Sequence, residues 1–201
     1  MFTEENVAGS PLDRIEGSRR LDSLGRLIAP LARRLGSGRI GQVLHGDWMG
    51  HPLHPALTDL PIGFWTSSFL LDMAGGRRSR KAAQRLVGAG LLAVVPTAAA
   101  GAADWASIHD DGPRRVGVAH VLGNSVATLL YAWSWTSRRR GRHAMGVAVG
   151  VAAATAATVG GYLGGHLAFG SSAASEDRGS SGAAADDSDT SSQLADATSS
   201  I

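Results

Sequence analysis

The sequence predicts an all-α polytopic membrane protein: a four-transmembrane-helix bundle with an N-terminal amphipathic helix and a disordered C-terminal tail. Apolar residues are concentrated in four segments, each close to the roughly 20 residues that a helix needs to cross a hydrocarbon core of about 30 Å. These segments have almost no charged face, which a soluble bundle would need on its outer side. Polar residues collect in the two tails and the short connections. The predicted spans are about 56–74, 86–103, 116–136 and 144–168.

The N-terminal region, residues 1–44, contains leucines at helical spacing with arginines between them, over residues 18–36. This pattern predicts an amphipathic helix that lies in the membrane interface. The alternative is a helix that caps the bundle or pairs with a partner. Pro30 would bend or break either one. The start of the chain lacks the charge and apolar order of a signal peptide, so we expect the spans to insert directly into the membrane.

The first span opens on the string His51-Pro-Leu-His54-Pro. The prolines bias both histidines toward extended geometry, and Pro55 suits the first turn of a helix. Asp59 follows one turn later. Because an ionisable residue is expensive in lipid, we expect Asp59 to face the bundle interior and to orient a histidine by a hydrogen bond.

The other spans also carry polar residues near one end. Asp104 and Trp105 end the second span, His120 and Asn124 share a face of the third, and His166 lies near the end of the fourth. Glycines at small-xxx-small spacing in the fourth span predict close helix packing. Pro61 and Pro96 lie inside spans, where neighbouring groups must satisfy the backbone.

Threading four spans alternately up and down brings six of the seven histidines to one side of the membrane. His45 and His109 would be loop residues there, and only His143 would lie on the other side. Positive charges concentrate in the predicted loops 75–85 and 137–143, which the positive-inside rule places in the cytoplasm. We therefore expect the histidine cluster and both termini to be extracytoplasmic, on the outer side of the cell membrane. The arginines of the N-terminal tail would have to cross with them.

The four histidines at span ends, His51, His54, His120 and His166, are the candidate ligands of a haem or a transition metal. Imidazole binds zinc, copper and iron, and two histidines from facing helices can hold a b-type haem. Haem is the more attractive cofactor, because the chain has no cysteine and no close carboxylate cluster. The favoured axial pair is His120 with His54 or His166. Asp59, Asp104, Trp105 and Asn124 would support the ligands.

Four motifs in order resemble the bacterial membrane-protein family called domain of unknown function 2231. They are GHPLHPALTDLPIGFW at 50–65, GAADW at 101–105, RRVGVAHVLGN at 114–124 and GGYLGGHLAFG at 160–170. The resemblance covers about 45–170 and implies four transmembrane helices without an established activity. Some relatives are fused to a Rieske-type iron–sulfur domain, which suggests an association with redox proteins. This chain departs from the family after Phe169.

The leading hypothesis is a small redox subunit in contact with membrane lipid, exchanging electrons with a partner protein or a quinone. The alternatives are a structural or assembly protein without a cofactor, and a proton or small-solute transporter. The transporter ranks last because charged groups stop at one leaflet. No motif supports an enzyme acting on its own, and no basic patch suggests nucleic acid. The domains would be 1–44, 45–170 and a low-complexity tail at 171–201, whose Ser, Ala, Asp and Gly cannot build a core.

Overall fold

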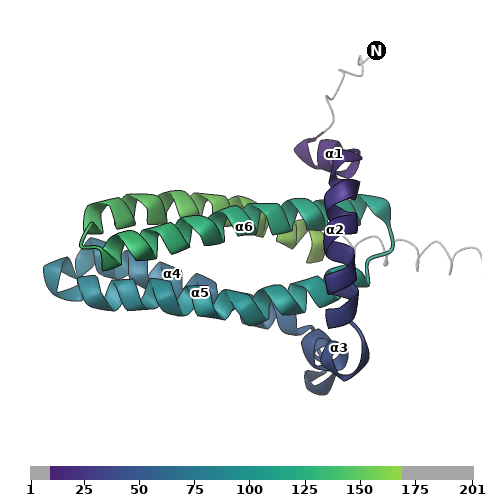
Figure 1. Ribbon diagram of the computed structural model, residues 1–201, viewed down its shortest axis with the longest axis horizontal. Helices are drawn as coiled ribbons and strands as arrows, with labels where there is room; N and C mark the ends of the chain where they lie inside the picture. The colour runs from purple at the N-terminus through teal and green to yellow at the C-terminus, as the bar shows by residue number, and fades with distance from the viewer. Residues whose placement is uncertain (1–9, 169–201) are drawn as a thin grey trace, which may run out of the picture. The chain divides into compact units, whose positions relative to one another are not determined.

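The computed structural model describes residues 10–168, and the regular elements in that range are helices (Figure 1). The chain divides into two compact units, residues 1–163 and 164–201. The elements are α1 (Pro11–Glu16), α2 (Arg20–Leu35), α3 (Gly38–His45), the 3₁₀ helix η1 (Asp47–Met49), α4 (Leu53–Ala74), α5 (Gly76–Ala106) and α6 (Asp111–Arg139). A final helix, His143–Ala168, begins in the first unit. The tail predicted at 171–201 lies outside the described residues.

Three helices in the described range are long and apolar enough to cross a membrane: α5, α6 and the final helix. They correspond to the second, third and fourth predicted spans. The first predicted span forms α4, which is 22 residues long but is not among the three. Two aspartates, Asp59 and Asp72, and a run of hydroxyl residues at 66–68 dilute its apolar content. The structure thus supports three of the four predicted spans by length and composition.

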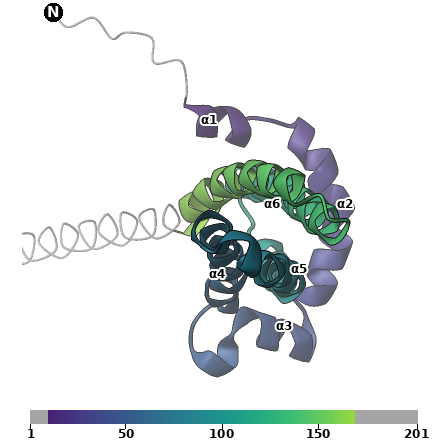
Figure 2. The same ribbon diagram turned by 90° about the vertical axis from the view of Figure 1, so that its left-hand side faces the viewer.

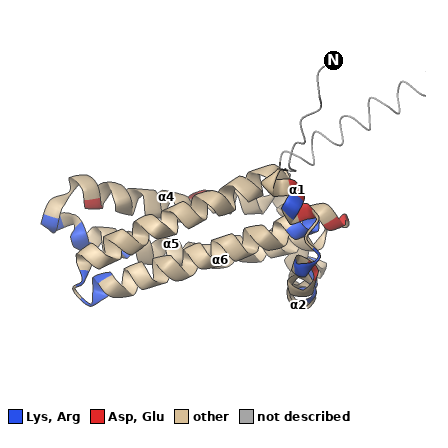
Figure 3. Cartoon of the chain, turned by 90° about the horizontal axis from the view of Figure 1, so that it is seen from above, with Lys and Arg blue, Asp and Glu red and all other residues tan. Residues whose placement is uncertain are grey.

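Helices α4 and α5 form a tight hairpin (Figure 2). The loop predicted at 75–85 is wrong, because α5 begins at Gly76, directly after the glycine that ends α4. Gly76 has a φ of 59°, a left-handed conformation that glycine adopts without steric cost. The arginines after it therefore lie on the first turns of α5. Figure 3 shows them gathered with those of the α6 end at the far end of the bundle from α2.

Hydrogen bonds join the hairpin along its length. Ser68 Oγ donates to the Ala83 oxygen at 2.9 Å, and Trp65 Nε1 donates to the Val87 oxygen at 3.3 Å. Gly90 faces the Trp65 indole so closely that a Cβ there would collide with it. Small residues on α5 thus let the backbones approach and bring polar side chains of α4 within reach of main-chain oxygens.

The region before α4 packs against the end of the bundle where α5 ends and α6 begins (Figure 1). Pro30 neither ends nor breaks α2, which continues to Leu35. Ala29 and Ala32 of α2 form a buried cluster with Trp105 and Val118. The opposite face of α2 is left exposed and carries Leu24, Leu27 and Leu31. Helix α2 therefore packs on the bundle through small residues and presents its leucines outward.

An ion pair fixes α2 to α6. Arg115 Nε lies 2.8 Å and Nη2 3.1 Å from the two carboxylate oxygens of Asp22. Arg115 Nη1 also donates to the Glu16 oxygen at 2.7 Å. Hydrogen bonding to Arg115 lowers the pKa of the Asp22 carboxyl below its usual value.

Candidate functional site

Two of the predicted ligands, His54 on α4 and His120 on α6, lie together inside the bundle. Their ring centroids are 6.3 Å apart, and the ring planes are inclined by 81°. His54 comes one residue after α4 begins, and Pro55 occupies the first turn as expected. His120 lies on α6 three residues after Gly117, which packs against Trp105. The pair thus joins the first and third predicted spans.

Each ring is held by a main-chain oxygen of another helix. His54 Nδ1 lies 2.9 Å from the Thr97 oxygen of α5, and His120 Nδ1 lies 2.8 Å from the Gly160 oxygen of the final helix. A carbonyl oxygen only accepts, so each Nδ1 carries the hydrogen and each Nε2 presents a lone pair. The same arrangement orients the histidines of metal sites, where Nε2 binds the metal. All four long helices contribute to the pair.

Glycines make the space that these rings occupy. A Cβ at Gly101 would lie 2.7 Å from His54 Cε1, and one at Gly160 would lie 3.0 Å from the Asn124 amide. Asn124 Nδ2 donates to the His120 main-chain oxygen at 3.0 Å and lies 3.2 Å from His120 Nε2. Asn124 therefore lies beside His120, on the same face of α6. Its amide contacts Nε2 of His120, the ring atom through which the imidazole would bind a cofactor.

Two other predicted site residues, His51 and Asp59, are exposed. His51 is exposed, with Nδ1 3.2 Å from the Pro52 oxygen. His166 belongs to the second compact unit, whereas His54 and His120 belong to the first. Asp59 is exposed rather than turned into the bundle. Pro61, Trp65 and Ser68 define the buried line of α4, and Asp59, two residues before Pro61, points about 200° round the helix.

Asp104 and Trp105 hold the N-terminal region on the bundle. Asp104 Oδ1 lies 2.9 Å from Nδ1 of His45, the last residue of α3. Trp105 is buried against α2, and its Nε1 donates to the Arg114 oxygen at 3.0 Å. The sequence placed His45 in a solvated loop, and this contact was missed. The apolar spacing of Ile40, Val43 and Leu44 just before His45 was the available sign of a helix.

The described residues contain no group of three or more His, Cys, Asp or Glu side chains that could hold a metal ion. Of the four predicted ligands, His54 and His120 are brought together within the first unit. Two imidazoles complete a ligand set only when the cofactor brings its remaining donors, as a porphyrin does.

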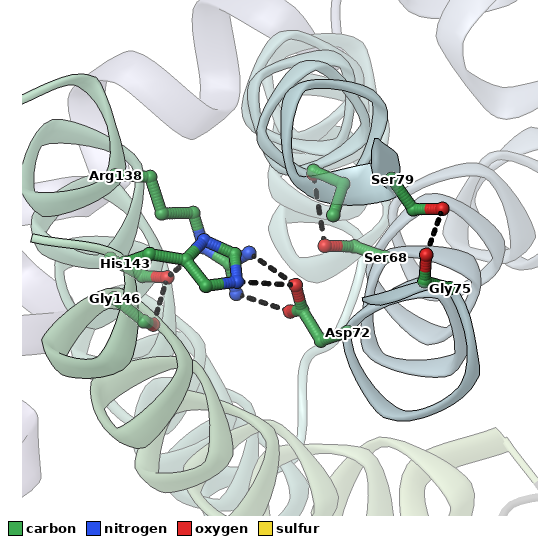
Figure 4. Close-up of polar contacts among 9 residues, drawn as sticks. Ser68, Asp72, Gly75, Ser79, Arg138, His143 and Gly146 are labelled. Carbon is green, nitrogen blue, oxygen red and sulfur yellow. Dashed lines mark hydrogen bonds and ion pairs between the residues drawn. The ribbon is translucent and has the colours of Figure 1, made fainter. Parts of the chain in front are cut away.

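A second polar cluster, missed by sequence reasoning, lies at the Arg-rich end of the bundle (Figure 4). Arg138 Nη1 and Nη2 donate to the two Asp72 carboxylate oxygens at 2.9 and 2.7 Å. The Arg138 side chain is 4 % exposed and the Asp72 side chain 2 %. His143 Nε2 lies 3.4 Å from Asp72 Oδ1, and Arg138 Nε donates to Ser134 Oγ at 3.2 Å. Ser134 in turn donates to the Gly146 oxygen. An aspartate inside an apolar segment was the available signal.

Comparison with known proteins identifies the family and adds no described function. No curated protein and no solved structure matches the chain. One family model, described as a predicted membrane protein, domain of unknown function 2231, matches residues 50–178. This range contains α4, α5, α6, the final helix and both polar clusters. The chain therefore belongs to the domain of unknown function 2231 family of predicted membrane proteins.

Proposed function

We propose that this protein is a small redox subunit of the bacterial cell membrane, which holds one b-type haem between His54 and His120. The observation that carries the proposal is the pair itself: two imidazoles from different helices, each with Nδ1 on a carbonyl. Nε2 of His120 lies 3.2 Å from Asn124 Nδ2, so binding of a cofactor there would displace this amide. The two ring centroids lie 6.3 Å apart, and His54 and His120 would hold the haem iron through Nε2. A haem would supply one-electron chemistry, and the helices would orient it and exclude water.

The proposal treats α4, the first predicted span, as a membrane span in addition to α5, α6 and the final helix. Its 22 residues reach about 33 Å as a helix. Its outward side chains include Leu60, Ile62, Phe69, Leu70 and Met73, which suit contact with lipid. A transmembrane domain at 45–170 is then consistent with the family range, which ends at 178.

The proposal also sets the orientation. The arginines at the start of α5 and the end of α6 favour a cytoplasmic position for that end, with the histidine pair and both termini on the extracytoplasmic side. Helix α2 would lie in the interface, since its exposed leucines stand beside the exposed cations Arg26, Arg33 and Arg34. Electrons would pass to a partner protein or a quinone.

The test is the visible spectrum of the full chain purified after expression with added haem. We expect a haem spectrum that His54→Ala and His120→Ala each abolish or alter strongly. His109→Ala, in the exposed connection between α5 and α6, is the matched control and should leave it unchanged. A colourless protein in which elemental analysis finds no metal would contradict the proposal.

A structural role without a cofactor is the second candidate. The observation in its favour is that both imidazoles already bind carbonyls of neighbouring helices. It predicts that His120→Ala lowers bundle stability and that no cofactor is lost. The transporter alternative was ranked last because charges stopped at one leaflet. The buried Asp72–Arg138 pair at the opposite end removes that reason.

A further inference from the structure

A cavity of about 130 Å³ lies between α4, α6 and the final helix, close to the Asp72–Arg138 pair. Its lining combines aromatic, charged and small apolar side chains. The residues that matter most are Trp65, Asp72, Tyr131, Arg138, Val151 and Ala154. The haem proposal makes no use of this space.

One wall of the cavity is a rigid aromatic stack. The rings of Trp65 and Tyr131 lie 3.8 Å apart with an interplanar angle of 15°. Trp65 is fixed by its hydrogen bond to the Val87 oxygen. Tyr131 is 6 % exposed, and its hydroxyl makes no hydrogen bond to any residue between 10 and 168. The described residues contain no fully buried side-chain polar atom without a partner, so the Tyr131 hydroxyl keeps some accessible surface. In lipid, a ligand with an acceptor oxygen would stabilise it.

The charges at the other end of the cavity exclude an ionic ligand. All three guanidinium nitrogens of Arg138 are engaged, two by Asp72 and one by Ser134. The Asp72 carboxylate is matched by Arg138 and lies near His143. Neither charge is left for an anion or a cation. The site therefore suits a neutral molecule.

The mouth of the cavity lies on the outer surface of the bundle. Thr66 and Phe69 of α4 and Val151 and Ala154 of the final helix line the cavity and are exposed. These residues belong to the middle of the proposed spans, where the surrounding medium is lipid. A ligand would therefore enter from the bilayer.

We infer that this cavity binds the ring of a lipid-borne quinone, with a ring carbonyl accepting a hydrogen bond from the Tyr131 hydroxyl. The planar ring suits the aromatic wall, and its acceptor oxygens suit the Tyr131 hydroxyl. Its neutrality suits the paired charges of Asp72 and Arg138. The volume of about 130 Å³ is slightly below that of a cavity of about 150 Å³ that binds benzene. The cavity would therefore hold the edge of the ring that carries one carbonyl, and the ring substituents and the isoprenoid tail would extend through the mouth. The inference names the quinone partner of the proposed redox role, but ring binding itself does not require haem.

The test is binding of decylubiquinone to the full chain in detergent, followed by quenching of tryptophan fluorescence. We expect saturable quenching, with a dissociation constant that rises about tenfold in Tyr131→Phe, the loss of one hydrogen bond. Ala154→Phe should obstruct the mouth and abolish binding. Tyr162→Phe, at an exposed tyrosine, is the matched control and should bind like the wild type.

Non-saturable quenching, or equal affinity in the wild type and both cavity variants, would overturn the inference and indicate partition into detergent. The haem proposal and the quinone inference can each be contradicted without the other. His54→Ala should alter the haem spectrum strongly and keep quinone affinity, whereas Tyr131→Phe should keep the haem spectrum and lose quinone affinity. Circular dichroism of each variant shows whether it has kept its helices.

Discussion

Pro61 lies inside the continuous helix α4, and a side chain of α5 lies beside the backbone oxygen that the proline leaves without its helical donor. A proline has no N–H, so the oxygen of Leu57, four residues earlier, loses its usual helical donor. Thr97 Oγ1 of α5 lies 3.1 Å from that oxygen and 2.8 Å from the Ala93 oxygen of its own helix. The sequence predicted that neighbours must satisfy Pro61. It could not identify Thr97, because the register of α5 against α4 depends on packing around Gly90 and Trp65.

Thr97→Val should therefore lower the free energy of unfolding by roughly 0.5–1 kcal/mol, the value of one interhelical hydrogen bond. The matched control is Thr155→Val, since Thr155 donates only to Val151 on its own helix and is exposed. Denaturation in detergent micelles would measure both. Equal stability of the two variants would show that Thr97 does not compensate for the proline.

The Asp72–Arg138 pair makes a larger prediction. Removing one partner leaves the other charge buried, which costs about 3–5 kcal/mol, so Asp72→Ala should unfold at much lower denaturant concentration. Replacing both residues by apolar side chains, Asp72→Leu with Arg138→Met, should restore most of the loss. Asp59→Ala, on the exposed face of the same helix, should change little. A double variant as unstable as the single one would contradict this account.

At the scale of the elements, apolar content predicted where the helices lie but not where α5 begins. The arginines at 77–85 are polar and yet helical, because their long side chains can reach the water from the first turns of a helix. The inward face of α4 was also unreadable, since apolar residues surround the helix on all sides. Only packing shows that Asp59 faces out and Asp72 faces in.

The attachment of α2 to the bundle should depend on pH through Asp22. Its folded-state pKa is lowered by Arg115, so the contact stabilises the attachment fully above the unfolded pKa of about 4 and is lost as the pH falls through the folded value. Hydrogen exchange of α2 should therefore increase in acid. Asp22→Asn should already show faster exchange at pH 7 and lose this part of the acid response. Asp47→Asn, at an exposed residue, is the control, and identical exchange in both variants would refute the role.

At the scale of the whole molecule, the expected alternation of the long helices predicted that polar residues of separate segments meet at one end, and His54 and His120 do lie together. Which histidines meet could not be read from the sequence, since Gly101 and Gly160 determine where the rings fit.

The chain has no cysteine, so single introduced cysteines can report on which side of the membrane a residue lies. Gln42→Cys and Ser107→Cys, both exposed, should react with an impermeant maleimide on intact cells, and Ala82→Cys only after permeabilisation. If Gln42 and Ser107 lie on opposite sides, α4 and α5 cannot both cross.

The central claim is that His54 and His120 bind the same iron, and electron paramagnetic resonance of the oxidised full chain tests it most directly. The wild type should give a low-spin signal with two axial imidazoles, and His54→Ala and His120→Ala should each convert it to high spin. His51→Ala, at the exposed neighbour of the site, should retain the wild-type signal. A low-spin signal that survives either substitution, or the lack of any iron signal in the haem-supplemented protein, would contradict the account.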